Sequence, residues 1–339
     1  GGKVYIAGGF SSPRAGIAAL DRNSGVANGW PQGISGSISS MQVVEGRLWV
    51  CGQFSSLLGV TRSGIAEVDT SSGVPLAFDA HAVGGVRSIV VTISIVYAGG
   101  GFFQIGGFAR AGLAALSTSS GVATAWDPTR PNTQIGSVAL DGSVLYVAGG
   151  FDSIGVVPEA RRGLAGIDVT TGLATAFQAD VTGGTAGVMT STGGELYLAG
   201  PFTGVGGQPR SGLAAVHIPG GRVSAWQADL PGQIIAIEPG AATLYLGGYF
   251  PTAGAYPQAS LAEFPDVATP AEAALVSVSA HPDAVELVWL APSLVNVALT
   301  VERRARDAAW TALADAGTDG RGYVTFTDRA VMPGADYDY

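Results

Sequence analysis

The sequence is poor in the residues that most often define the chemical class of a protein. It has one cysteine, and charged residues make up 13% of its 339 positions, with a formal net charge of −9. A single cysteine, Cys51, excludes a disulfide within the chain, and we interpret it as a small buried residue. An acidic chain without a basic cluster is a poor candidate for binding nucleic acid or an anionic membrane surface.

Long apolar runs are also missing. No segment has the roughly 20 uninterrupted apolar residues that a membrane-spanning helix needs, and no signal peptide is recognisable. We therefore expect no membrane insertion within this chain. Because residue 1 falls inside a repeated element, we also expect the natural protein to begin further upstream.

Side chains that usually carry catalysis are few and scattered. The three histidines, His81, His217 and His281, lie in different segments and have no zinc-like spacing to a cysteine or carboxylate. No nucleophile elbow or Ser/His/Asp set stands in a recognisable context. We expect no catalytic residue, no metal and no cofactor. Carboxylate pairs for glycoside hydrolysis stay open, because their geometry would span separate repeats.

Glycine is abundant, with 52 residues, and much of it belongs to an internal repeat. An aromatic residue, four further residues and a phenylalanine recur six times, as in YVAGGF at residues 146–151. We number the repeats 1 to 6 by these phenylalanines: Phe10, Phe54, Phe102, Phe151, Phe202 and Phe250. The Gly-Gly pair, Gly149 and Gly150 in repeat 4, predicts close packing that lets aromatics of the neighbouring blade approach.

Three further segments accompany each motif. A β-branched segment precedes it from repeat 2 onward, and a box such as RSGIAEVD follows it, headed by Arg14, Arg62, Arg110, Arg161 and Arg210. A Gly-to-aromatic segment then ends at Trp30, Phe78, Trp126, Phe177 and Trp226. Four strand-like segments in about 48 residues are typical of a β-propeller blade. We predict an all-β propeller of about six four-stranded blades over residues 1–267, incomplete in its first and last copies, with a seventh blade left open for the intact protein.

These boxes resemble the delta-60 repeat family of bacterial propeller-type repeats, whose pattern reads LYVGGxF, R, LAALD, TG and W in order. The resemblance covers roughly residues 3–265. It implies a propeller and an extracytoplasmic or cell-surface protein, and it implies no catalytic residues. The text LAALSTSSGVATAW is also similar to the repeat of quinoprotein propellers, but the calcium ligands and catalytic acid of that family cannot be placed in this chain.

The repeat ends before the last seventy residues. Residues 268–339 begin with a proline-containing entry, alternate apolar and polar residues, and end with VMPGADYDY. This segment resembles a fibronectin type III domain that is truncated at its C-terminus. The resemblance makes Tyr337 the candidate tyrosine-corner residue.

Three recurring features are candidates for binding. The arginines predict structural hydrogen bonds to loop carbonyls, with an anion-binding ring as the alternative. The aromatic series predicts core between blades, with sugar stacking as the alternative. The acidic residues that follow it predict turn caps, with a cation or polar ligand near the channel mouth as the alternative; they are Asp79, Asp127, Asp180 and Asp229.

Every recurring feature has a scaffold explanation. We therefore expect a non-enzymatic binding, adhesion or scaffold protein, extracellular or at the cell surface, that presents propeller loops to a polysaccharide or protein ligand. The loops whose length varies between repeats are residues 55–61, 103–109, 152–160 and 203–209. The alternatives are a carbohydrate-active or quinoprotein-like enzyme and a ligand-sensing ectodomain.

Overall fold

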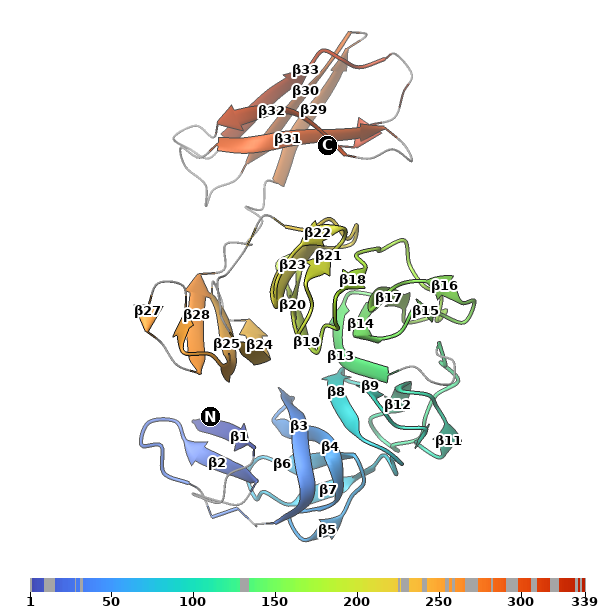
Figure 1. Cartoon of the computed structure of the whole chain (residues 1–339), viewed down its shortest axis with the longest axis vertical. Coiled ribbons are helices and arrows are strands. Elements are labelled where there is room, and N and C mark those ends of the chain that lie inside the picture. The colour runs from blue at the N-terminus through green and yellow to red at the C-terminus, as the bar shows by residue number, and fades with distance from the viewer. Residues whose placement is uncertain are drawn as a thin grey trace. The chain divides into compact units, whose positions relative to one another are not determined.

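The computed structural model is built from β-strands (Figure 1). It describes residues 2–8, 16–27, 29–30, 33–128, 134–224, 226, 232–239, 243–253, 256–257, 260–265, 274–281, 283–290, 298–305, 310–317, 323–332, 335 and 337–338. Within these ranges there is no helix long and apolar enough to cross a membrane. The chain divides into two compact units, Gly1–Pro265 and Asp266–Tyr339; the sequence predicted this boundary after residue 267.

The first unit contains one antiparallel sheet for each sequence repeat. Repeat 1 has β1 (Lys3–Ala7) and β2 (Ile17–Asp21), and repeat 2 has β3 (Ile34–Val44), β4 (Arg47–Leu57), β6 (Ile65–Asp69) and β7 (Pro75–Asp79). Repeat 3 has β8 (Val86–Val91), β9 (Ile95–Gly100) and β12 (Leu113–Ser117), and repeat 4 has β13 (Gln134–Asp141), β14 (Val144–Gly150) and β17 (Leu164–Asp168). Repeat 5 has β19 (Val188–Thr192), β20 (Glu195–Ala199) and β23 (Leu213–His217), and repeat 6 has β24 (Gln233–Pro239), β25 (Thr243–Tyr249) and β28 (Leu261–Pro265).

Successive sheets pack on one another through their first strands. Strand β3 contacts β8, β8 contacts β13, β13 contacts β19, and β19 contacts β24 (Figure 1). Polar side chains link these strands: the N–H of Val91 donates to Oε1 of Gln42 (2.8 Å), and the N–H of Val138 donates to Oγ of Ser88 (3.1 Å). The sheets therefore form a linear series in which each one is held by its neighbours.

The apolar core lies between consecutive sheets. In each of repeats 1 to 5 the motif aromatic packs against the aromatic that ends the same repeat, for example Tyr146 against Phe177 with ring centroids 4.9 Å apart. This pair also packs against Met189 and Leu198 of the next sheet. Burying one such large side chain contributes on the order of 1.5–3 kcal/mol.

The motif glycines lie opposite a bulge in the first strand of their own sheet. In β13 the register shifts between Ile135 and Ser137, and Ile135 faces Gly149. A Cβ on Gly149 would lie 2.1 Å from the carbonyl oxygen of Gln134, whereas one on Gly150 would meet nothing within 4 Å. The sequence predicted that these glycines make room for aromatics of a neighbouring blade. At Gly149 the approaching group is instead backbone of the same sheet.

The predicted fourth strand is regular only in repeat 2, where β7 pairs with β6. In repeats 1, 3, 4 and 5 this segment makes a single β-bridge. Side-chain hydroxyls in this segment accept backbone N–H groups that could otherwise pair with the neighbouring strand. The N–H of Trp126 donates to Oγ1 of Thr124 (3.2 Å), and the N–H groups of Phe177 and Trp226 donate in the same way to Thr175 and Ser224. Repeat 2 has Leu76 at this position, so the backbone stays free to pair. The prediction of four-stranded sheets was therefore wrong for most repeats.

The loops of variable length form short hairpins in place of irregular chain. These are β5 (Val60–Thr61) with the end of β4, β10 (Gln104–Ile105) with β11 (Phe108–Ala109), β15 (Ser153–Ile154) with β16 (Glu159–Ala160), β21 (Gly204–Val205) with β22 (Gln208–Pro209), and β26 (Thr252–Ala253) with β27 (Tyr256–Pro257). Strand β18 (Val181–Thr182) adds to the β21–β22 hairpin.

The second unit contains two three-stranded antiparallel sheets. One has the order β29 (Ala274–His281), β30 (Ala284–Leu290), β33 (Tyr323–Asp328), and the other β32 (Thr311–Gly317), β31 (Ala298–Ala305), β34 (Tyr337–Asp338). Arg303 on β31 joins them through an ion pair to the buried Asp328 on β33, with Nη1 and Oδ2 2.7 Å apart. The N–H of Met332 donates to the hydroxyl oxygen of Tyr337 (3.1 Å).

Candidate functional site

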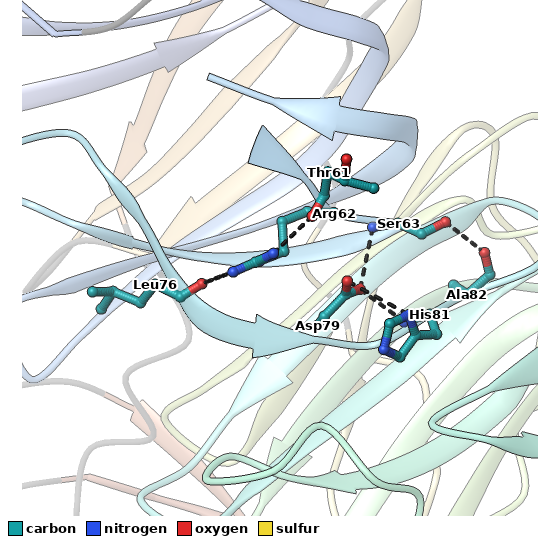
Figure 2. A network of polar contacts seen from close by, with 7 residues as sticks. All are labelled: Thr61, Arg62, Ser63, Leu76, Asp79, His81 and Ala82. Atoms are coloured by element: carbon teal, nitrogen blue, oxygen red, sulfur yellow. Dashed lines mark hydrogen bonds and ion pairs between the residues drawn. The ribbon is translucent and has the colours of Figure 1, made fainter. Parts of the chain in front are cut away.

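The box arginines join two backbone segments within each repeat. Each guanidinium donates to the carbonyl of the preceding residue and to a carbonyl fourteen residues further on, just before the terminal aromatic. In repeat 2 the acceptors are Thr61 and Leu76, as Figure 2 shows. In repeat 4, Arg161 donates to Ala160 (2.8 Å) and Thr175 (2.8 Å). Arg110 and Arg210 bond in the same way, and Arg14 lies outside the described residues.

The acidic residues cap the backbone beside these arginines. In repeat 2, Oδ1 of Asp79 accepts hydrogen bonds from the N–H of His81 (3.0 Å) and of Ser63 (3.4 Å), as drawn in Figure 2. The hydroxyl of Ser63 in turn donates to the carbonyl oxygen of Ala82 (2.8 Å). In repeat 4, Asp180 accepts from the N–H of Arg162 (2.9 Å). The carboxylates thus hold the residue after the arginine against the connection to the next sheet.

The acidic residues are not gathered into one site. Asp127 faces Arg110, with Oδ2 and Nη1 3.5 Å apart, and the other two described members serve their own repeats. Across the ranges that the structure describes, no three His, Cys, Asp or Glu side chains lie close enough to hold a metal ion together. Asp229 falls outside those ranges. Asp79 and Asp180 thus accept backbone hydrogen bonds, and Asp127 pairs with an arginine of its own repeat.

The aromatic and phenylalanine series are core residues. Trp30, Phe78 and Phe177 are buried, as are the motif phenylalanines Phe54, Phe102, Phe151, Phe202 and Phe250. Trp126 and Trp226 are partly buried, and Phe10 lies outside the described residues. The burial of these rings fits the predicted core role. Cys51 is fully buried in the core between repeats 2 and 3, and burial strongly raises the pKa of its thiol.

The loop hairpins are anchored on the preceding repeat. The N–H of Gly106 donates to the carbonyl of Ala80 (2.6 Å), and Val83 forms a β-bridge with Gln104. Gly206 donates in the same way to the carbonyl of Asp180 (2.9 Å). These two hairpins are therefore held at their turn residues by the connection at the preceding acidic position.

Large apolar side chains are exposed on two of these hairpins. In repeat 3, Phe103 is 66% and Phe108 is 50% exposed, and Arg110 lies 5.5 Å from the ring centroid of Phe108. In repeat 4, Val156 and Val157 are exposed at the tip of the next hairpin. The sequence reasoning selected the loops but missed these side chains. The signal available was FFQIGGF, in which Phe103 stands where the loops of repeats 2, 4 and 5 have Ser55, Asp152 and Thr203.

His217 makes a contact that its sequence position did not predict. It ends β23, where repeats 1, 2 and 4 have an aspartate, and its Nδ1 lies 2.5 Å from Oε1 of Glu195 on the neighbouring strand. Glu195 is buried, and Arg222 contacts the other ring nitrogen of His217 (3.1 Å). The missed signal was Glu195, a carboxylate at a position that is aliphatic in the two preceding repeats.

Aspartates at the end of the third strand close turns at the opposite end of the strands from where the hairpins begin. The hairpin of repeat 4 folds back onto one of these turns, because the N–H of Val156 donates to the carbonyl of Gly172 (3.0 Å). Oδ1 of Asp168 accepts hydrogen bonds from the N–H and hydroxyl of Thr171 (2.6 and 2.9 Å) and from the N–H of Thr170 (2.9 Å). These bonds lower the pKa of Asp168, and equivalent bonds lower the pKa values of Asp21 and Asp69.

The substitution Asp168→Ala is expected to lower the melting temperature at neutral pH and to matter less in acid. A carboxyl whose pKa is depressed on folding stabilises the protein above its unfolded value of about 3.9, and this contribution is lost as the pH falls through the folded value. The difference in melting temperature between wild type and variant should therefore narrow from about pH 5 to about pH 2. Asp152→Ala, at an exposed loop residue, is the control. A difference that stays constant over this range would contradict the turn assignment.

Taken together, the fold and these contacts define an all-β protein built from repeated small antiparallel sheets. No family model and no curated protein matches the chain. Similar solved structures include the computationally designed Ika8 protein, which is 9% identical, with 91% of this chain and 89% of that chain covered and a TM-score of 0.47. BamB from Moraxella catarrhalis is 15% identical, with coverage of 91% and 77% and a TM-score of 0.36. The designed Ika4 protein is 9% identical, with coverage of 56% and 95% and a TM-score of 0.34. At this level of similarity the function has to be argued from the residues of the chain itself.

Proposed function

We propose that the first unit is a six-bladed β-propeller of delta-60-type repeats and that the second unit is a fibronectin type III-like domain. The propeller is supported by the sixfold motif and by packing of successive sheets through their first strands, the strands that line the axis of a propeller. The second assignment is supported by the two three-stranded sheets and by the hydrogen bond from Met332 to the hydroxyl of Tyr337, which has the geometry of a tyrosine corner.

The function that this geometry supports best is non-enzymatic binding of a protein at the hairpin end of the propeller. The observation that carries it is the exposure of Phe103, Phe108 and Val157 on adjacent hairpins. Exposed apolar side chains gathered in one region mark interaction surfaces, and aromatic residues and arginine are enriched at protein interfaces. Arg110 beside Phe108 supplies that combination.

Anchoring of the hairpins also favours binding. Because each hairpin is hydrogen-bonded to the preceding repeat, little backbone freedom is lost when a ligand binds. The arginines and aspartates around the hairpins are occupied in backbone hydrogen bonds, so they act as a frame for the apolar residues. We place the protein outside the cytoplasm or at the cell surface, as the repeat resemblance implies; fractionation of producing cells tests this location.

The paired substitution Phe103→Ser and Phe108→Ser is expected to abolish retention of the protein partner. Immobilised wild-type chain is incubated with an envelope extract of producing cells, and retained proteins are identified by mass spectrometry. Interface aromatics often contribute more than 1 kcal/mol each, so the pair should weaken binding by about tenfold or more. Since both side chains are exposed, the fold should be unchanged.

Ile93→Ser is the control, because Ile93 is 79% exposed at the other end of the sheets. Retention of the same proteins by the phenylalanine variant and the control, or no specific retention at all, would overturn the proposal. A glycan array run in parallel distinguishes the two classes of ligand. If polysaccharide binding depends on both phenylalanines, the ligand of the hairpins is a polysaccharide in place of a protein, and the proposal of a binding function stands.

A further inference from the structure

We propose that a pocket between the sheets of repeats 2 and 3, at the end opposite the hairpins, binds a neutral sugar ring. Its volume is about 290 Å³, close to the lower end of ordinary small-ligand pockets. Residues at the end of β3 and on β4, β6 and β7 line it from repeat 2, and the end of β8 with the turns after β8 and β12 line it from repeat 3. Phe103, Phe108 and Val157 do not line this pocket, so the site uses other side chains than the protein-binding surface proposed above.

Three lining residues depart from the repeat pattern. Position 47 carries arginine, and the equivalent residues are Lys3, Ile95, Val144, Glu195 and Thr243. Position 49 carries tryptophan, and every other repeat has tyrosine there. Glu67 pairs with Trp49 across the strands; in four other repeats the tyrosine faces a small residue, Ala19, Ala115, Gly166 or Ala215, and in repeat 6 it faces Glu263. A scaffold role does not require these three changes together, because the other sheets pack without them.

The equivalent space is lined by aliphatic residues in repeats 3 and 4, whereas in repeat 1 it is also open, with a volume of about 580 Å³ beside Lys3, Tyr5 and Thr70. Ile95 and Val144 stand where repeat 2 has Arg47, and both pack against their core clusters. In repeat 1 the corresponding Lys3 is engaged, because its ammonium donates to the carbonyl oxygen of Thr70 (2.6 Å). Arg47 bonds to no backbone carbonyl that the structure describes; its partner is the side chain of Glu67. Repeat 2 therefore differs from repeat 1 in the polar pair beside the pocket, where the side chain of Arg47 meets that of Glu67.

The chemistry of the mouth matches a hydroxyl group. Nη1 of Arg47 lies 3.0 Å from Oε1 of Glu67, and the arginine side chain is half exposed. A donor and an acceptor side by side suit a ligand group that both accepts and donates, and both side chains are planar groups that can bond two adjacent hydroxyls. Because their charges cancel, a neutral ligand leaves no charge unpaired.

The rest of the lining agrees with a small polyol. Thr92 and Thr118 donate their hydroxyl protons to the carbonyls of Ile95 (3.1 Å) and Ile93 (3.0 Å). The Thr92 oxygen also accepts from the N–H of Ile95 (3.0 Å), so it keeps one lone pair for a ligand hydroxyl. Trp49 and Phe78 line the inner end. Both rings are buried, so they add apolar lining for the C–H groups of a sugar, and the volume limits the site to one ring. This separates the pocket from a groove that follows a polysaccharide chain.

The test measures binding of single sugars to the full chain by saturation-transfer NMR. The panel contains glucose, galactose, mannose and N-acetylglucosamine as neutral probes, with glucuronate and glucosamine as charged probes. We expect millimolar binding of at least one neutral sugar, and a loss of about tenfold or more, equivalent to about 1.4 kcal/mol, in each of Glu67→Ala and Arg47→Ile. Both substitutions introduce residues that other repeats carry at the same positions, so the melting temperature should change little.

Glu159→Ala is the matched control, because it removes the Glu159–Arg161 ion pair (3.0 Å) at the hairpin end of the protein. It should leave sugar binding unchanged. The proposal is overturned if no neutral sugar binds at about 20 mM, a sugar concentration at which dissociation constants above about 1 mM are still detected. It is also overturned if only a charged probe binds, or if the control loses as much affinity as the pocket variants. The phenylalanine variant of the hairpins should bind the sugar normally, which keeps this result distinct from that of the protein-binding test.

Discussion

Replacing Gly149 with alanine is expected to destabilise the first unit by about 3 kcal/mol, near the upper end of overpacking effects. The new Cβ would lie 2.1 Å from the carbonyl oxygen of Gln134. That oxygen belongs to a bulged strand packed between two sheets, so it cannot move without disturbing the pairing of β13 with β14. Chemical denaturation followed by tryptophan fluorescence measures the effect as a shift of the midpoint.

The neighbouring glycine provides the control. A Cβ on Gly150 would meet nothing within 4 Å, and Gly150 does not have a positive φ. Alanine there should leave stability unchanged or raise it by up to about 1 kcal/mol, because it restricts the unfolded chain. Equal losses for the two variants would mean that the glycines share one role, and would refute the bulge explanation.

Replacing Arg161 with alanine is expected to cost about 3 kcal/mol. Its guanidinium donates to the carbonyls of Ala160, Thr175 and Phe177, and its side chain is 11% exposed. Hydrogen bonds from a charged donor are typically worth about 1.5–3 kcal/mol each, and water replaces only part of that when the site is mostly buried. The loss should appear as a lower denaturation midpoint, together with faster amide exchange around residues 175–177.

Arg162 is the matched control next to it. Its side chain is 66% exposed and lies 3.9 Å from Asp152, an arrangement worth at most about 0.5 kcal/mol. Arg162→Ala should therefore unfold close to the wild type. Arg161→Lys keeps the charge without the planar fork, so it should recover less than half of the loss. A lysine variant as stable as the wild type would show that charge alone carries the effect.

The periodic features were the predictable part of this fold. An arginine at one fixed position per repeat predicted hydrogen bonds to loop carbonyls, because five donors at a constant place suit a constant backbone. The absence of a regular fourth strand from most repeats could be predicted only in part. Thr124 and Leu76 occupy the same repeat position, but whether a hydroxyl replaces a ladder bond depends on local backbone geometry, which residue type does not fix.

The candidate sites were less predictable, because they depend on contacts between repeats. Spacing placed Asp79 and Asp180 at one end of the sheets, yet their partners, the N–H groups of Ser63 and Arg162, follow from the path of the chain around each arginine. Predicting the pocket at Arg47 requires knowing which residue of β4 is paired with Glu67 on β6. Register supplies that fact, and a list of repeats does not.

Anchoring of each hairpin on the preceding repeat has a consequence for how such a chain can be recombined. The stretch that carries a hairpin and its support runs from one acidic position to the next arginine, for example from Asp79 to Arg110, and so straddles the boundary between two motifs. A graft cut at the motif boundaries would separate the loop from the carbonyl of Ala80 that holds its Gly106. The segment that can be exchanged as a unit therefore does not coincide with one sequence repeat. Gene fusions that transfer a hairpin between such proteins should place their junctions within the sheets.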